Sequence, residues 1–500
     1  MKNALKWLEN TVSLFGDKPI YCDENSSVSF EEVFDKARRI GTALDKKLWT
    51  KAPVAVFMDR CAKTPIGFAG VVYSGRAYAP IDSNLPKQRI KKILEILNPE
   101  VVLTEDKLKD KVSDYTTDKE ILTYEELTKY DIDEQRLAEI RRQMVATDPL
   151  YLIFTSGSSG NPKGVITSHE SLITYINAYS KVMEIDKTDR LGNQSPLDYI
   201  AAIRDIYLPM KTGCSTYIIP KEYFMEPENL FKFMNDNEIT AVGWSVSAFT
   251  IANSLGAFEE SKLNTLKKIC FSGSVMPGKC IRKWQENLKD AKFVNQYGPT
   301  ETTASCTYYV LDHLIEEDEV IPIGKAYDGY RVFLLDEDNN EVLEGIEGEI
   351  CVSGPALALG YYNDYQRTSE AFVQNPLTKG YYERMYRTGD IGIYLPDGNL
   401  EFHGRKDRQI KHMGHRVELD EVEYAANMID GVSESCCIYI KEKEKLILFY
   451  TGDISKRDVV IGLRDVLPGF MVPRKVIQLE NLIKLPNGKI DYTKMKESLK

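Results

Sequence analysis

The sequence has 500 residues, more than one ordinary hydrophobic core supports, so we expect at least two domains. Its 43% hydrophobic and 28% charged residues are typical of a soluble globular protein, and a net charge of −11 excludes a sequence-independent nucleic-acid binder. Because no apolar run approaches a membrane span and no signal-peptide core begins the chain, we expect a cytoplasmic protein with no membrane partner.

Strand and helix patterns alternate through the first 300 residues. We expect strands at 53–58, 77–82 and 100–104, helices from residue 63 and over 85–97, and an earlier helix capped by Ser29. The charged stretch 105–148 is expected to be a surface excursion. Helices follow at 170–183 and 227–235, with strands at 215–220, 239–244, 268–272 and 292–297. This βαβ alternation predicts an α/β fold with mostly parallel sheets.

The pattern changes after residue 320. Residues 330–402 contain short alternating strands separated by turn pairs, which predicts a β-rich subdomain. The last residues form a compact, charged mixture of strands and helices, and the polar stretch from Gly404 to Gln409 is typical of a hinge. We therefore expect an N-terminal core over residues 1–403 and a small, mobile α+β lid domain over residues 404–500.

The loop over residues 155–164 follows an apolar strand and is rich in small hydroxyl residues and glycine. Glycines allow a phosphate to approach the backbone closely, and Lys163 adds positive charge. It is not a Walker A loop, because Pro162 precedes the lysine and Gly164 follows it. The loop predicts a phosphate site of another kind.

Three further loops carry polar residues suited to a nucleotide. Asn295-Gln-Tyr-Gly-Pro-Thr-Glu-Thr-Thr303 offers an aromatic ring, a hydroxyl and a carboxylate, which fit a base, a phosphate and Mg²⁺. Tyr386-Arg-Thr-Gly-Asp390 places a carboxylate at a turn, and Leu485-Pro-Asn-Gly-Lys489 places a lysine just after one. Each alone is typical of a surface turn, but together and in this order they indicate a site.

The ordered set resembles the adenylate-forming superfamily, which includes acyl-CoA synthetases, luciferases and the adenylation domains of nonribosomal peptide synthetases. The resemblance covers nearly the whole chain, including residues 75–82, 348–356, 360–362 and 404–407. It implies a large N-terminal domain of αβαβα-layered sheets and ATP-dependent activation of a carboxylic acid with Mg²⁺. Among its members, free-standing D-alanine:carrier protein ligases have a similar size.

The resemblance also implies roles for individual residues. The phosphate loop would grip the triphosphate, while Tyr297 would stack on adenine beside Asn295 and Gly298. The remaining assignments concern the α-phosphate, the metal, the ribose, the hinge and the substrate carboxylate. The residues assigned in this way are Thr155, Ser156, Gly157, Ser158 and Lys163 for the triphosphate, Thr300 for the α-phosphate, Glu301 for Mg²⁺, Asp390 and Arg405 for ribose, Asp407 for the hinge, and Lys489 for bridging the carboxylate and the α-phosphate.

The acceptor of the acyl group is indicated by the segment from Arg416 to Glu423. Its Arg-Val-Glu-Leu-Asp-Glu-Val-Glu pattern resembles carrier-protein-loading domains, whereas CoA ligases more often have Gly-Pro in place of the Glu-Leu pair. The chain has no Gly-Gly-x-Ser carrier motif. We therefore expect a phosphopantetheine thiol on a separate carrier protein, with an acyl-CoA synthetase as the alternative and a catalytically silent scaffold as a third hypothesis.

The acid is less defined. In activators of α-amino acids a pocket aspartate pairs with the substrate ammonium, and an ungapped reading puts Ile200 at that position, with Asp198 two residues earlier. Either the substrate lacks an α-amine, which we favour, or Asp198 takes the role because an offset of two keeps one strand face. A hydroxylated aryl acid then fits better than D-alanine. The other implied pocket residues are Ala201, Arg204, Gly243, Cys270, Ser272, Gln296, Ala304 and Ser305.

Gln296 is expected to address a polar group of the substrate. Arg204 has the same potential, but we expect it to pair with Asp205 or to face solvent.

Overall fold

A computed structural model describes residues 2–157, 161–485 and 490–499. The chain divides into two compact units. Unit 1 contains Met1–Ser83, Leu97–Ile153 and Gly164–Lys406, and unit 2 contains Asn84–Ile96, Phe154–Lys163 and Asp407–Lys500.

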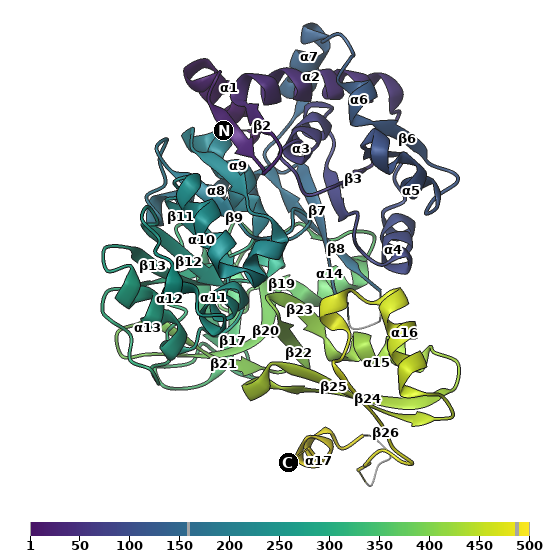
Figure 1. The fold of residues 1–500 in the computed structure, drawn as a ribbon, viewed down its shortest axis with the longest axis vertical. Coiled ribbons are helices and arrows are strands. Elements are labelled where there is room, and N and C mark those ends of the chain that lie inside the picture. The colour runs from purple at the N-terminus through teal and green to yellow at the C-terminus, as the bar shows by residue number, and fades with distance from the viewer. Residues whose placement is uncertain (1, 158–160, 486–489, 500) are drawn as a thin grey trace. The chain divides into compact units, whose positions relative to one another are not determined.

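Unit 1 contains a nine-stranded sheet whose central strands are parallel (Figure 1). In spatial order the strands are β15 (Lys325–Ala326), β14 (Thr307–Leu311), β13 (Lys292–Tyr297), β12 (Lys268–Ser272), β11 (Ala241–Ser245), β9 (Arg190–Asn193), β10 (Ser215–Ile218), β1 (Pro19–Cys22) and β2 (Ser27–Ser29). The α/β class predicted from the alternating pattern is confirmed. The pattern missed β9, a short strand that contributes only four residues.

A second sheet of seven strands is also mostly parallel. Its order is β18 (Gly360–Tyr361), β8 (Lys163–Ser168), β7 (Pro149–Thr155), β4 (Tyr78–Asp82), β3 (Val54–Met58), β5 (Val101–Thr104) and β6 (Glu120–Thr123). Treating residues 105–148 wholly as a surface excursion was wrong. That stretch supplies the edge strand β6, whose Leu122 and Thr123 are buried while Glu120 faces solvent.

The helices follow the strands in the order expected of βαβ units. Their bounds are α1 Leu5–Phe15, α2 Phe30–Lys47, α3 Thr64–Tyr73, α4 Lys87–Leu97, α5 Lys109–Ser113, α6 Tyr124–Leu127, α7 Glu134–Gln143, α8 His169–Val182, α9 Ala202–Thr212, α10 Pro227–Asp236, α11 Val246–Ser254, α12 Ala257–Glu260, α13 Gly278–Asn287, α14 Tyr365–Ala371, α15 Leu419–Asn427, α16 Lys456–Val466 and α17 Tyr492–Glu497. Ser29 caps α2 as predicted, because its Oγ accepts from the Glu32 N–H at 3.1 Å.

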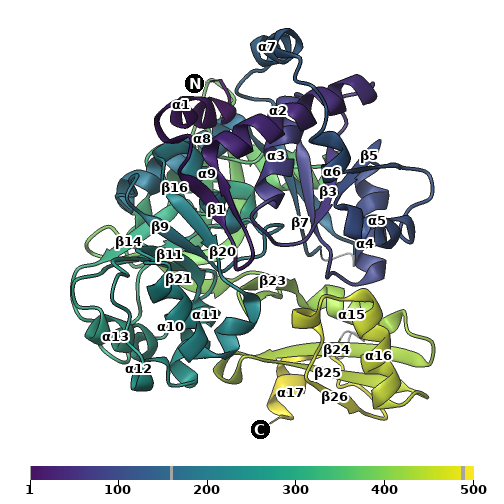
Figure 2. The same cartoon turned by 45° about the horizontal axis from the view of Figure 1, so that its top comes forward.

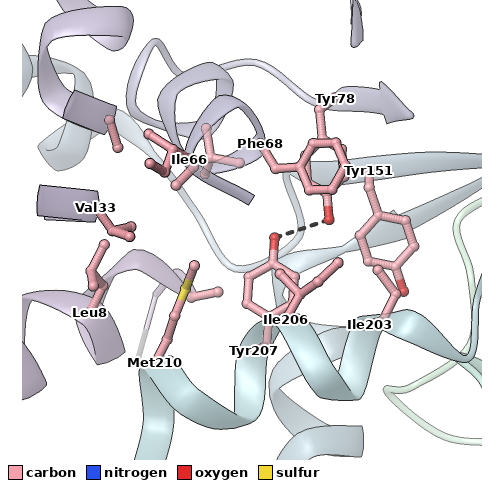
Figure 3. Packing of buried hydrophobic residues seen from close by; sticks show 14 of the residues in the cluster. Leu8, Val33, Ile66, Phe68, Tyr78, Tyr151, Ile203, Ile206, Tyr207 and Met210 are labelled. Carbon is pink, nitrogen blue, oxygen red and sulfur yellow. Dashed lines mark hydrogen bonds between the residues drawn. The ribbon is translucent and has the colours of Figure 1, made fainter. Parts of the chain in front are cut away.

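Helices α8 and α9 pack in the core between the two large sheets. One hydrophobic cluster contains Tyr78 and Tyr151 from the seven-stranded sheet, Cys270 from the nine-stranded sheet and most of the buried face of α9. Figure 3 shows the Tyr207 hydroxyl donating to the Tyr78 hydroxyl at 3.2 Å inside this cluster. Because α9 is held from both sides, its first turn has a fixed position against the nine-stranded sheet.

The opposite face of the nine-stranded sheet is covered by helices α10 to α13, which lie together in Figure 2. This second cluster is rich in aromatic rings, with Trp244 and Trp284 fully buried at 6.3 Å between ring centroids. Alternate residues of β11 and β12 therefore point into different cores. Trp244 and Phe271 face the outer helices, while Gly243 and Cys270 face α9.

Residues 331–405 form the predicted β-rich part of unit 1. Its strands are β16 (Arg331–Leu335), β17 (Gly348–Ser353), β20 (Arg384–Tyr394), β19 (Phe372–Gln374) and β21 (Leu400–Arg405), and neighbouring strands pair antiparallel. Unit 2 contains the hairpin β22 (Gln409–His412) and β23 (His415–Glu418), and a sheet of β24 (Val432–Ile440), β25 (Lys445–Gly452) and β26 (Lys475–Gln478). Within the described ranges, no helix has both the length and the apolar character needed to cross a membrane.

Candidate active site

Asp390 is the centre of a buried hydrogen-bond cluster in unit 1. Strands β20 and β21 pair so that Asp390 lies opposite Arg405, whose Nη1 donates to Asp390 Oδ1. The Tyr297 hydroxyl, from the end of β13, donates to the other carboxylate oxygen. Burial and the Asp390 carboxylate raise the pKa of Tyr297 well above its ordinary value, so the hydroxyl stays protonated and donates. The structure thus brings together Asp390, Arg405 from 15 positions later and Tyr297 from 93 positions earlier.

The backbone around this cluster is equally constrained. Thr388 Oγ accepts from the Asp390 N–H at 3.0 Å, and Arg405 Nη2 donates to the Thr388 carbonyl at 3.1 Å. The sequence offered no signal for Thr388 beyond its place in the same motif. Asn295, two residues before Tyr297, donates from Nδ2 to the Pro322 carbonyl at 2.7 Å. Its predicted position near the adenine amino group remains a prediction.

Gly298 allows the chain to pack closely where β13 ends. A Cβ on Gly298 would lie 2.5 Å from Ser305 Cα and 2.7 Å from Cys306 N. These are backbone atoms, so no larger residue fits without a shift. The structure gives Gly298 a packing role, and its predicted contact with the nucleotide remains a prediction.

The short 3₁₀ turn Thr300–Thr302 carries two residues assigned to phosphate and metal. Glu301 is fully buried, and its Oε1 accepts from the Tyr361 hydroxyl at 2.7 Å. The next residues, Thr303 and Ala304, have φ values of +56° and +72°, which L-residues rarely adopt. Such strain is held in place by its surroundings, here by the Thr303 Oγ bond to the Ala356 carbonyl at 2.7 Å. Tyr361 belongs to residues 360–362, which share in the resemblance but have no predicted role.

The oxygen donors at this turn suit a hard cation. Mg²⁺ in nucleotide sites is usually held by one or two carboxylates together with phosphate oxygens and water. Glu301 supplies one carboxylate, and the described residues contain no group of three or more His, Cys, Asp or Glu side chains that would form a protein-only metal centre. The residues therefore fit a metal that arrives with a phosphate ligand.

The phosphate loop belongs to unit 2, where residues 158–160, and with them Ser158, lie outside the described ranges. Ser156 Oγ donates to the Arg416 carbonyl at 2.9 Å, and the Gly157 N–H donates to Glu421 Oε2 at 3.1 Å. The other Glu421 oxygen pairs with Arg89 Nη1 at 2.5 Å. The Glu421 carboxylate thus accepts the hydrogen bond from the Gly157 N–H, a donor that the prediction assigns to a phosphate oxygen. Thr155 and Lys163 are both buried at the two ends of this loop.

Unit 2 also contains the residues that follow the predicted hinge. Asp407 Oδ1 accepts from the Gln409 N–H at 3.1 Å, which closes a short turn. The next residue, Arg408, donates to both oxygens of Glu423 at 3.1 and 2.8 Å. Glu423 also accepts from the Tyr492 hydroxyl at 3.1 Å. Lys489 lies outside the described residues, so its assignment remains a prediction.

Four of the residues predicted to line the acid pocket share one face of the nine-stranded sheet. Gly243 and Cys270 are paired across β11 and β12, and Ser272 and Gln296 are paired across β12 and β13. Residues two apart on a strand point the same way, so all four face α8 and α9. Ser305 follows the strained residues Thr303 and Ala304 and lies beside these four residues, since its Oγ donates to Gln296 Oε1 at 3.2 Å. Ala304 precedes it in the same turn.

Arg204 enters this face from the first turn of α9. The expectation that it faces solvent was wrong, since the side chain is only 1% exposed. Its Nη2 donates to the Gly243 carbonyl, and its guanidinium lies so close that a Cβ on Gly243 would fall 2.3 Å from Arg204 Nε. Asp205 is its carboxylate neighbour at 3.9 Å, so the expected pairing is present but loose.

Asp198 and Ile200 lie in the segment between β9 and α9. This segment forms turns rather than a strand, so the argument that an offset of two keeps Asp198 on one face was wrong. Burial and Asp82 raise the pKa of Asp198 to about 7, and Lys221 opposes them. Ile200 is 6% exposed and joins the hydrophobic cluster around α9, with Ala201 at the N-cap of that helix.

Comparisons with known proteins place the chain among nucleotide-dependent ligases. Residues 8–362 match the family model described as AMP-binding enzyme. Tyrocidine synthase 1 of Brevibacillus parabrevis is 29% identical over 99% of this chain, although the chain spans only 45% of that relative. Among solved structures, an artificially fused adenylation–PCP di-domain, NpsA-ThdA from Klebsiella oxytoca, has a TM-score of 0.82 at 19% identity, covering 95% of this chain and 93% of its own. The o-succinylbenzoate CoA synthetase of Bacillus subtilis has a TM-score of 0.84 at 18% identity, covering 99% and 98%.

Proposed function

Because this chain belongs to the AMP-binding enzyme family, we propose that it converts a carboxylic acid and ATP into an acyl adenylate and pyrophosphate. The acyl group then passes to the phosphopantetheine thiol of a separate carrier protein, and AMP is released. Enzymes of this family use ATP, generally with Mg²⁺. The observation that carries the proposal is the buried cluster of Tyr297, Asp390 and Arg405 in unit 1.

The cluster suits a ribose. Asp390 presents a carboxylate whose two oxygens are already held by a hydroxyl and a guanidinium, so its remaining lone pairs have a fixed direction. A pair of vicinal sugar hydroxyls would donate to those lone pairs. Thr300 and Glu301, on the turn that follows β13, would then meet the phosphates, and Glu301 would hold Mg²⁺.

The reaction needs charge control more than acid–base catalysis. The attacking carboxylate is already ionised at neutral pH, so no protein base is required. Lys489 would bridge the substrate carboxylate and the α-phosphate, and the phosphate loop with Lys163 would hold the leaving pyrophosphate. Mg²⁺ would neutralise charge that develops on the phosphates. We further propose that residues 404–500 form a lid that turns about Asp407 before the thiol attacks the adenylate.

The choice of acceptor depends on the segment from Arg416 to Glu423, which resembles carrier-protein-loading domains. Structural similarity does not discriminate between the two acceptors. The adenylation–PCP di-domain and the CoA synthetase resemble this chain almost equally, with TM-scores of 0.82 and 0.84. The discriminating experiment supplies the adenylating enzyme with either a phosphopantetheinylated carrier protein or free CoA. Acyl transfer to the carrier supports the proposal, and transfer to CoA without any carrier supports the alternative, an acyl-CoA synthetase.

We also propose that the acid lacks an α-amine. An ungapped reading of the sequence assigns Ile200 to the position where an ammonium partner would be needed, and an unpaired buried ammonium is costly. The charged groups that act on Asp198 are Asp82, the last residue of β4, and Lys221, three residues after β10 ends. They differ from the groups that act on Arg204. An amino-acid ligase, such as one for D-alanine, remains the alternative. It would be indicated by pyrophosphate exchange that occurs with the amino acid and is lost with the same acid lacking its amino group.

A further inference from the structure

The predicted acid pocket of unit 1 contains a buried arginine, Arg204, whose carboxylate neighbour lies at the long distance of 3.9 Å. Arg204 is fully buried, and its guanidinium is charged at any pH a protein experiences. Its carboxylate neighbour, Asp205, lies 3.9 Å away and accepts from Asn193 Nδ2 at 2.8 Å. Arg60 also acts on Asp205, so two guanidinium groups share that carboxylate.

The other polar neighbours of Arg204 are uncharged. Burial raises the pKa of Cys270 to about 11, so its thiol carries no charge at neutral pH. Burial likewise raises the pKa of Tyr175 to about 12, and Arg204 opposes that rise. Tyr179 has its pKa raised well above the ordinary value. Among these neighbours of Arg204, Asp205 is therefore the one that carries a negative charge, and it lies 3.9 Å away.

Two N–H donors on this face also have no acceptor among the described residues. One is Arg204 Nε, and the other is Gln296 Nε2, whose amide oxygen already accepts from Ser305. Arg204 and Ser305 both lower the pKa of Tyr175, which places that hydroxyl near both of them. Arg204 and Gln296 are thus connected through Tyr175 and Ser305. Buried donors without acceptors cost free energy unless a ligand supplies the missing oxygens.

Gly243 makes room for this arrangement. A side chain at that position would collide with the guanidinium, since its Cβ would lie 2.3 Å from Arg204 Nε and 2.6 Å from Cζ. The absence of a side chain at Gly243 therefore leaves room for the guanidinium beside β11, where Nη2 donates to the Gly243 carbonyl and Nε lies 3.9 Å from Asp205 Oδ1. A guanidinium offered in this way is well suited to a carboxylate, which it recognises through planar, paired hydrogen bonds.

We propose that the acid activated by this enzyme is a dicarboxylic acid, whose second carboxylate is bound by Arg204 and Gln296. This inference rests on the proposed function, because it assigns the first carboxylate to adenylation. It also agrees with the assignment of the apolar Ile200 to the position where an α-ammonium would need a partner. The second carboxylate would supply the acceptors that Arg204 Nε and Gln296 Nε2 lack.

The test compares matched pairs of acids in ATP–pyrophosphate exchange with the full chain: succinate against butyrate, glutarate against valerate, and terephthalate against 4-methylbenzoate. In each pair a methyl group replaces the second carboxylate. We expect at least one diacid to exceed its partner by about 100-fold in kcat/KM, because the partner leaves buried donors unpaired. A monoacid that equals or exceeds its diacid across the pairs, while exchange is robust, overturns this inference alone. Absence of exchange with every acid overturns the proposed function and the inference with it.

Variants give an independent readout. Arg204→Met should lower the diacid preference to within about threefold, and Arg204→Lys should keep part of it. Gly243→Ala displaces the guanidinium without removing its charge and should raise KM for the diacid. This variant replaces Arg204→Met in the test if Arg204→Met does not fold. The matched control is Arg190→Met, a partly exposed arginine of β9 that pairs with Glu238. If Arg204→Met slows all acids equally and leaves their order unchanged, Arg204 is only a structural residue and the inference is wrong.

Discussion

The Arg408 guanidinium lies over the Tyr492 ring, with Cζ 3.6 Å from the ring centroid. Arg408 immediately follows the predicted hinge residue, and Tyr492 begins α17, three residues after Lys489. Glu423 accepts hydrogen bonds from both Arg408 and Tyr492. These contacts connect the residue after the predicted hinge to α17. We infer that α17 moves with the residues that follow Asp407 as one body.

This link predicts that the Tyr492 ring matters more than its hydroxyl. Tyr492→Ala removes the cation–π contact, worth about 1 kcal/mol, and should slow adenylation by roughly fivefold to tenfold. Tyr492→Phe keeps the ring and should lose less than about threefold. The measurement is kcat for pyrophosphate exchange, with folding checked by circular dichroism. Equal rates for the alanine variant and the wild type would contradict the link.

Lys489 is predicted to act in the first half-reaction. Lys489→Ala should lower pyrophosphate exchange by about 100-fold or more, because one positioned charge donor is lost, while ATP still binds. Lys484→Ala is the matched control, since Lys484 lies close in sequence but pairs with Glu434 at 2.7 Å on the surface. Exchange and ATP affinity are measured separately. Normal exchange in the Lys489 variant would remove the lysine from the mechanism.

Asp390 is predicted to bind ATP rather than to take part in chemistry. Asp390→Asn breaks the ion pair with Arg405 and should raise KM for ATP about tenfold, with a smaller change in kcat. Tyr297→Phe removes only the hydroxyl and should have the milder effect. Asp397→Asn, in an exposed turn between β20 and β21, is the control. A fall in kcat at unchanged KM would argue against a ribose site.

Much of this arrangement was accessible from the sequence. The alternation of strands and helices predicted the α/β class, and the ordered loops identified the residues that the structure gathers around Asp390. What the sequence missed depends on tertiary packing. Arg204 is polar in a helix, so local pattern favours solvent, yet α9 is buried between two sheets. Asp198 was read as part of a strand because its neighbours are apolar, but the chain turns there. No local signal predicts the bond from Tyr361 to Glu301, which joins residues 60 positions apart.

His169 predicts a loss of stability in acid. It is fully buried, its Nδ1 accepts from the Ala4 N–H at 3.3 Å, and burial together with Arg141 lowers its pKa to about 4. An unfolded histidine has a pKa near 6.5, so the folded state favours the neutral ring. The stability it contributes is therefore fully present above pH 6.5 and lost as the pH falls through about 4, up to about 3 kcal/mol.

The measurement is the urea midpoint of unfolding between pH 7 and pH 4. His169→Gln, which keeps an acceptor but does not titrate, should lose less stability on acidification than the wild type. His403→Gln is the control, because hydrogen bonds to Glu347 and Glu401 raise the pKa of this more exposed residue. Parallel curves for the wild type and the His169 variant would show that His169 does not carry the effect.

We expect this chain to join an acid to AMP before any thiol is involved. The decisive measurement is acid-dependent exchange of labelled pyrophosphate into ATP, without carrier protein or CoA. A carboxylic acid should start the exchange, Mg²⁺ should be required, and no ADP should form. Formation of ADP and phosphate, or exchange that appears only after a thiol acceptor is added, would contradict it.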